Sequence, residues 1–176
     1  MKYVTLHWTG GTGMPTKYEL SRYHFLVDEN CEVWEGDMPP EANKSPLDPA
    51  IYVRHSGGFN SDNIGIGLCG MVGAQESPFV PGPHPVSMGQ FDKGAEVAAE
   101  MCDIYEIPVK EGRVQLHSEI LPFYGRGKYK WDVNWVEGMI GPIAPDLMGH
   151  SFRLKVSEHL QLQLSCWQRF WKGIRE

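Results

Sequence analysis

Apolar and polar residues alternate in several short stretches of the chain, and this period of two indicates β-strands. The first stretch, residues 3–7, ends at a histidine and is followed by Trp-Thr-Gly-Gly, which favours a turn. Residues 23–27 and 32–35 flank the polar sequence Asp-Glu-Asn and together predict a β-hairpin. Residues 63–68, where Gly alternates with Ile and Leu, and residues 113–117 predict further strands.

Two other stretches have a period near 3.6 residues and predict helices. Ser87 to Gln90 has the form of a capping box, and apolar residues then recur at helical spacing from Phe91 to Tyr105, just before Pro108. Near the C-terminus, apolar residues recur at spacings of four and three, so we expect an amphipathic helix from about residue 154 to residue 174. Its apolar positions are Leu160, Leu164, Trp167, Trp171 and Ile174.

The strands, helices and loops together predict an α/β fold, a single-domain mixed β-sheet flanked by helices. Residues 37–50 and 72–86 are rich in Pro and Gly, have no sustained period and predict surface loops. We expect the sheet domain to occupy residues 1–150 and the C-terminal amphipathic helix to occupy residues 151–176.

The apolar seam of the C-terminal helix predicts that this helix docks on the domain. Its composition leaves two alternatives open, because residues 151–176 contain five basic and two acidic residues and are rich in Trp. These alternatives are contact with a membrane surface and self-association.

Composition narrows the class of protein. A chain of 176 residues suits one domain with a substantial core. Its net charge of −6 argues against a protein whose main function is to bind nucleic acid, since such binding needs a basic surface. The four cysteines form no CxxC pair, and we expect them to be reduced and structural.

The N-terminus enters the first strand without the apolar h-region of a signal peptide, and no later segment has the apolar length of a membrane span. We therefore expect a monomeric protein that stays in the cytoplasm of the producing cell unless something else releases it.

Candidate chemistry centres on residues 113–135. A strand ends at His117, and a Gly-containing loop then leads to Lys130 and Asp132, so an imidazole comes beside a loop that carries a cation and a carboxylate. A catalytic zinc takes three protein ligands and leaves one position for water, so His117 and Asp132 need a third partner. His7, at the end of the first strand, is the best candidate. The alternative is that each histidine is purely structural.

Taken together, the motifs resemble the zinc-dependent N-acetylmuramoyl-L-alanine amidases, the family that includes phage endolysins and peptidoglycan recognition proteins. The ordered set is more specific than any single motif, and it covers about residues 1–136. The matching segments are residues 3–9, 23–27, 55–60 with 64–67, 116–120 and 130–132.

The resemblance implies that His7, His117 and Asp132 bind Zn²⁺ and that Tyr23 and Lys130 are the catalytic side chains. A lysine cation near zinc is suited to stabilising the oxyanion that forms when an amide is attacked. A phenol can orient the water or pass a proton. Without the resemblance, Lys130 would be interpreted as a solvated surface lysine and Tyr23 as a half-buried strand tyrosine.

The resemblance also places His55 and Asn60 in the cleft as candidates for binding the muramyl-peptide, although each could equally satisfy a turn. The implied reaction is hydrolysis of the amide between the lactyl group of N-acetylmuramic acid and L-alanine, in peptidoglycan or a muropeptide. We expect a phage lysis enzyme, which acts on the cell wall after release from the producing cell. A recognition module without turnover is one alternative, which the complete ligand set disfavours, and a cytoplasmic recycling amidase is another.

Two departures from the family pattern affect the rim of the cleft more than the metal ligands. The gap between His7 and Tyr23 is short for the helix that many members place there. Asp132-Val133-Asn134 stands where many members have Asp-Pro-Gly.

Overall fold

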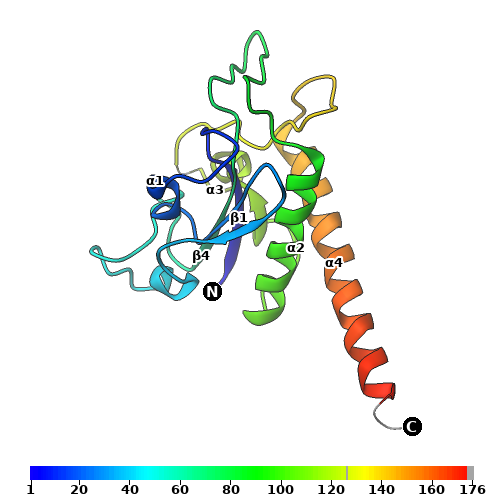
Figure 1. Cartoon of the computed structure of the whole chain (residues 1–176). Helices are drawn as coiled ribbons and strands as arrows, with labels where there is room; N and C mark the ends of the chain where they lie inside the picture. The colour runs from blue at the N-terminus through cyan, green and yellow to red at the C-terminus, as the bar shows by residue number, and fades with distance from the viewer. Residues whose placement is uncertain (126, 174–176) are drawn as a thin grey trace.

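The computed structural model describes residues 1–125 and 127–173, with the backbone alone for residues 164 and 166–173. A five-stranded sheet of order β3-β2-β4-β1-β5 runs through the molecule (Figure 1). β1 is parallel to β4 and β5, β4 is parallel to β2, and β3 is antiparallel to β2, so the predicted mixed sheet is confirmed. The strands are β1 (Tyr3–Trp8), β2 (Phe25–Val27), β3 (Val33–Glu35), β4 (Asn63–Leu68) and β5 (Val114–Leu116).

Two long helices, α2 (Met88–Ile104) and α4 (Pro145–Gly173), lie side by side against the sheet (Figure 1). The predicted capping box starts α2: the Ser87 hydroxyl accepts from the Gln90 N–H, and the Gln90 side chain accepts from the Ser87 N–H. The shorter helices are α1 (Lys17–Leu20), η1 (Pro40–Asn43), η2 (His117–Glu119) and α3 (Ile120–Tyr124). The four residues of α1 fit the short gap between the first strand and the hairpin.

Side chains alternate across the central strands and give the sheet two different faces. Leu6 of β1 and Leu68 of β4 meet α2, where a Cβ atom added to Gly94 would lie 3.0 Å from each. The opposite face carries polar side chains and glycines. Thr5 there donates to Asn63 across the strand pair at 3.0 Å, and both side chains are buried. The chemistry-bearing residues therefore lie on the face that the two long helices leave open.

Helix α4 begins nearer the N-terminus than the sequence predicted. Met148, Phe152 and Val156 recur every fourth residue and are buried. Gly149 interrupts the apolar pattern there, and a Cβ atom at this position would lie 2.1 Å from Oε1 of Glu119. Leu160 is partly buried against the same core. The later predicted seam positions, 164, 167, 171 and 174, lie outside the residues whose side chains are described.

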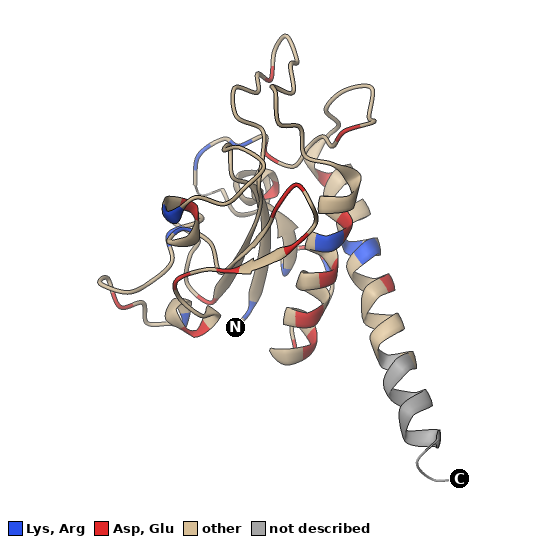
Figure 2. Ribbon diagram, in the orientation of Figure 1, with Lys and Arg blue, Asp and Glu red and all other residues tan. Residues whose placement is uncertain are grey.

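Charged residues are unevenly distributed (Figure 2). Acidic residues recur along α2, and one of them, Asp92, pairs with Lys155 of α4. Cys31, Cys69 and Cys102 are free thiols, as expected, and the side chain of Cys166 is outside the described part. None of the described helices combines the length and the apolar character that crossing a bilayer requires.

Candidate metal centre

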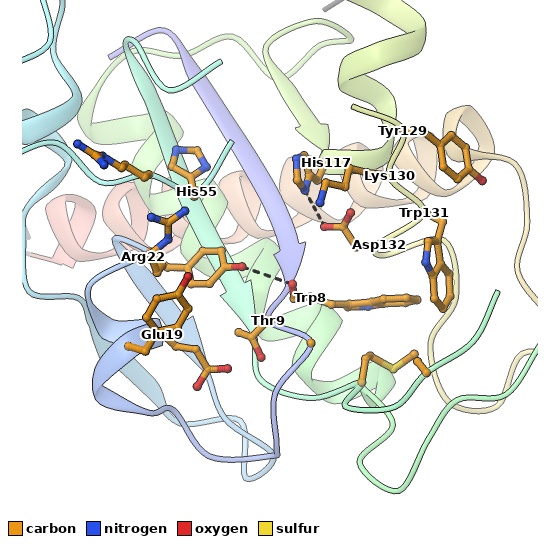
Figure 3. A pocket seen from close by; sticks show the side chains of 16 residues that line it. Trp8, Thr9, Glu19, Arg22, His55, His117, Tyr129, Lys130, Trp131 and Asp132 are labelled. Carbon is orange, nitrogen blue, oxygen red and sulfur yellow. Dashed lines mark hydrogen bonds and ion pairs between the residues drawn. The ribbon is translucent and has the colours of Figure 1, made fainter. Parts of the chain in front are cut away.

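A cleft of about 550 Å³ opens on the polar face of the sheet. The cleft joins the end of β1, the start of the β2 hairpin, the loop before β4 and the segment after α3 (Figure 3). Its lining includes His55, His117, Tyr23, Lys130, Trp131 and Asp132.

Three predicted metal ligands converge at this cleft. His7 comes from β1, His117 begins η2 directly after β5, and Asp132 lies in the loop beyond α3. One ligand atom from each residue lies within 4.8 Å of the others. Oδ2 of Asp132 is 3.0 Å from Nδ1 of His117 and 3.5 Å from Nδ1 of His7. Because β1 and β5 are neighbouring parallel strands, their ends deliver the two imidazoles to one place.

The chemistry of these three groups fits Zn²⁺. Two imidazole nitrogens and a carboxylate oxygen form a donor set that catalytic zinc uses, with a further coordination position left for water. Oδ1 of Asp132 is buried and has no hydrogen-bond partner within the described part of the chain. A buried carboxylate oxygen without a partner is costly, and a cation at this position would satisfy it.

Burial and mutual contact set the charges of these ligands. Burial lowers the pKa of His7 to about 4, and the nearby charge of His117 acts in the same direction. Burial alone would favour the neutral acid at Asp132, but contacts with His117 and His7 outweigh it and hold the pKa of this carboxyl well below its usual range. At neutral pH the site therefore offers a neutral imidazole at His7 and an ionised carboxylate, the protonation states that metal binding requires.

Tyr23 and Lys130 both reach the cleft. The ring of Tyr23 lies 5.4 Å from the ring of His7, and its hydroxyl is 3.5 Å from the carbonyl oxygen of Trp8. Burial raises the pKa of Tyr23 far above neutral, so the phenol keeps its proton and offers a hydrogen-bond donor. Lys130 is exposed and lies beside Asp132 at the edge of the cleft (Figure 3).

His55 and Asn60 have different positions. His55 lines the cleft, but it is buried, and its two ring nitrogens lie 3.1 Å from Nε2 of His7 and 3.1 Å from the carbonyl oxygen of Asn63. Asn60 is not brought into the cleft. It lines a separate pocket with Tyr52, and its side-chain oxygen accepts from the backbone N–H of Ser56 at 2.8 Å.

A hydrogen bond that the sequence did not indicate joins the segment after His117 to the segment after Asp132. The hydroxyl of Ser118 donates to the side-chain oxygen of Asn134 at 2.7 Å, so the residue after His117 is tied to the segment after Asp132. Val133, which lies between Asp132 and Asn134 in the sequence, is fully buried and has a φ of 65°. A β-branched residue rarely adopts this left-handed conformation, and the surrounding contacts must therefore enforce it. This is the segment that departs from Asp-Pro-Gly.

A second carboxylate, Glu19, also lines the cleft. Its Oε2 accepts from both the backbone N–H and the hydroxyl of Thr16, each at 2.7 Å, in the capping box of α1. The Thr-x-x-Glu spacing is the sequence signal that identifies this role. Glu19 therefore serves the helix end, and its position does not bring it into the ligand group of His7, His117 and Asp132.

Comparisons with known proteins place this geometry in context. A family model described as N-acetylmuramoyl-L-alanine amidase matches residues 1–133, which include the three converging residues. Among solved structures, a mutant of PlyL is 15% identical, with 89% of this chain and 84% of that chain covered and a TM-score of 0.48. The structure of PlyL is 16% identical, with 71% and 70% covered and a TM-score of 0.44. No curated protein matches the chain.

Proposed function

The chain belongs to the N-acetylmuramoyl-L-alanine amidase family, and we propose that it uses Zn²⁺ to hydrolyse the amide between the lactyl group of N-acetylmuramic acid and L-alanine in peptidoglycan. The observation that carries the zinc part is the convergence of His7, His117 and Asp132. Oδ1 of Asp132, which is buried and has no hydrogen-bond partner in the described structure, supports it. The complete ligand set favours an enzyme over a recognition module that binds without turnover.

In this proposal His7, His117 and Asp132 hold the ion, and the remaining side chains act on the substrate. Zn²⁺, when bound, supplies an activated water and polarises the scissile carbonyl. Lys130 places an ammonium group beside the reacting amide, where it stabilises the negative charge that develops on the carbonyl oxygen. Tyr23 stays protonated, so its phenol orients the reacting groups by donating a hydrogen bond.

The cleft wall also suits an anionic peptide. Arg22 and Arg54 both line it. Each guanidinium lies over an aromatic ring, Arg22 over Tyr18 at 5.8 Å and Arg54 over Tyr52 at 4.9 Å, which restricts its motion. A stem peptide ends in a carboxylate, and guanidinium groups bind carboxylates in a bidentate geometry. We assign these arginines to the peptide part of the substrate.

Hydrolysis of purified peptidoglycan sacculi tests the proposal. The protein should release peptides with new L-alanine amino termini, a chelator should stop the release, and added Zn²⁺ should restore it. His117→Ala should lose both zinc and activity while it remains folded, because two ligands are too few to hold the ion tightly. Sacculi cleaved without new L-alanine termini would exclude the amidase reaction, and hydrolysis by metal-free protein would exclude the zinc mechanism.

A parallel assay on soluble muropeptides separates two biological roles within the same chemistry. A phage lysis enzyme, the role that we propose, cleaves intact sacculi efficiently. A recycling amidase would cleave soluble muropeptides and leave sacculi largely intact. The ratio of the two rates therefore decides between the roles.

A further inference from the structure

His55 contacts the ring nitrogen of His7 that does not face Asp132. Nδ1 of His7 points to the carboxylate, at 3.5 Å, while Nε2 lies 3.1 Å from Nδ1 of His55. The two imidazole rings are nearly perpendicular, with centroids 5.2 Å apart. Nε2 of His55 in turn lies 3.1 Å from the carbonyl oxygen of Asn63. A row of three groups thus runs from strand β4 to the candidate metal position.

The end of this row fixes the direction of its hydrogen bonds. The carbonyl oxygen of Asn63 can only accept, so Nε2 of His55 carries the proton. The ring of His55 is buried and faces the rings of His7 and His24, where a charge without a counter-ion would be costly, so the ring is neutral and its Nδ1 is a bare acceptor. His7 must then donate from Nε2, and its own Nδ1 is left with a free lone pair. This lone pair faces Asp132 and His117.

The surroundings of His55 hold its ring in this place. A Cβ atom added to Gly65 of β4 would lie 2.4 Å from Cγ of His55, so the ring occupies space that only glycine leaves open. The hydroxyl of Ser56 lies 3.1 Å from Nδ1 of His55 and can donate to the same lone pair. Asn63 is anchored as well, because its side chain donates to the carbonyl oxygen of Phe59 at 2.7 Å.

We propose that His55 is a positioning residue that sets the tautomer of His7, so that Nδ1 of His7 presents its lone pair to the metal before the metal binds. The proposal rests on the zinc site proposed above. Metal-bound histidines commonly donate their other N–H to a carboxylate, a carbonyl or water, and loss of such a partner typically lowers metal affinity by about 10- to 100-fold. Here a second, uncharged histidine, His55, accepts the hydrogen bond from the N–H of His7. The carbonyl oxygen of Asn63 in β4 sets the tautomer of His55.

Two isosteric variants separate the acceptor from the rest of the ring. In His55→Asn, the side-chain oxygen replaces the acceptor Nδ1. In His55→Gln, the amide nitrogen replaces the donor Nε2, which leaves the hydroxyl of Ser56, at the longer distance of 3.4 Å, to accept from Nε2 of His7. Zinc affinity, measured by competition with a chromophoric chelator, should stay close to the wild-type value in His55→Asn. It should fall by roughly 10- to 100-fold in His55→Gln. His150→Gln, a replacement on α4 away from the ligand group, controls for loss of an unrelated histidine.

Equal zinc affinity in both variants, whether high or low, would overturn the proposal. NMR of the labelled imidazole nitrogens in zinc-free wild type tests it without any substitution: His7 and His55 should both be protonated at Nε2 and bare at Nδ1. A proton on Nδ1 of His55 would overturn it too. A wild-type protein that binds no zinc contradicts the proposed function instead, and the tautomer measurement still decides the role of His55.

Discussion

Lys130 and Tyr23 come to the cleft from an exposed loop and from the start of a hairpin, and their environments give them different chemistry. The half-buried phenol keeps its proton because burial disfavours the phenolate. The lysine side chain is exposed and can move toward a substrate without breaking a buried contact. Neither side chain resembles a zinc ligand, since one is a protonated phenol and the other an ammonium group.

Replacement of Lys130 by Met should separate catalysis from metal binding. We expect turnover to fall by roughly 100-fold or more, the usual scale for loss of one group that stabilises an oxyanion. Zinc affinity should not change, because Lys130 supplies no ligand atom. Lys128→Met is the matched control, since this neighbouring lysine is exposed but does not line the cleft. Equal turnover in the two variants would remove Lys130 from the mechanism.

His24 makes the stability of the fold depend on pH. Its ring is buried, and its Nδ1 accepts from the backbone N–H of Gly65 at 2.9 Å. Burial lowers its pKa from 6.5 to about 4. Between these values the unfolded chain binds a proton that the folded chain does not, so the free energy of unfolding falls as the pH falls. The full window corresponds to roughly 3 kcal/mol.

His24→Asn keeps an acceptor for Gly65 but cannot titrate in this window. Chemical denaturation of zinc-free protein, near neutral pH and near the folded-state pKa of about 4, should therefore show a weaker loss of stability in the variant than in the wild type. His7 and His55 contribute to the pH dependence of both proteins. The same pH dependence in both would contradict the assignment of a buried, neutral His24.

At the scale of elements, helix α4 is tied to the loop that carries a metal ligand. Glu119, two residues after His117, is fully buried and accepts from the backbone N–H of Leu116 at 2.8 Å. Arg153 of α4 donates to the same carboxylate at 3.0 Å. Gly149 lets the helix approach this close. The buried ion pair therefore fixes η2, and with it the position of His117, against the C-terminal helix.

Arg153→Met should leave Glu119 buried without its cation and lower the free energy of unfolding by about 3–5 kcal/mol. The double variant with Glu119→Gln should recover part of this loss, because the uncompensated charge is gone. Lys155→Met is the control, since its partner Asp92 is far more exposed and such pairs contribute about 0–1 kcal/mol. Thermal or chemical unfolding measures these three variants and the single variant Glu119→Gln. An additive double variant would show that the pair is not coupled.

Much of this element structure could be predicted from the sequence. The alternation in β1 and β4, the hairpin around Asp28 and the capping box at Ser87 are local patterns, and each one produced the expected element. The start of α4 could not be predicted in this way. Gly149 is unfavourable inside a helix. It is needed there because a side chain at this position would collide with Glu119, which lies far away in the sequence.

In the whole molecule, the sheet lies between the hydrophobic core and the cleft that holds the candidate site. One face packs on α2 and α4, and the other opens into the cleft. Arg22, Arg54 and Lys130 line the cleft together with Glu19 and Asp132, and further acidic residues lie along α2 (Figure 2). The net charge of −6 thus coexists with cations where an anionic substrate would bind. These cations would favour the encounter with the proposed anionic stem peptide.

The candidate site could be predicted only in part, because some of its contacts join residues that are far apart in the sequence. His7, His117 and Asp132 were identifiable from their motifs, and the fold brings them together. The contact between His7 and His55 spans 48 positions in the sequence, and no local pattern indicates which nitrogen faces which partner. The position of Asn60 outside the cleft likewise depends on how its loop folds back onto Ser56.

The proposed function depends on one zinc ion held in the cleft by His7, His117 and Asp132. Anomalous diffraction from a crystal of the zinc-loaded protein, recorded across the zinc absorption edge, tests it most directly. We expect a single strong peak about 2.0–2.2 Å from Nδ1 of His7, Nδ1 of His117 and a carboxylate oxygen of Asp132, with its remaining position open to the cleft. A loaded crystal with no peak there, or with its zinc on other residues, would contradict it.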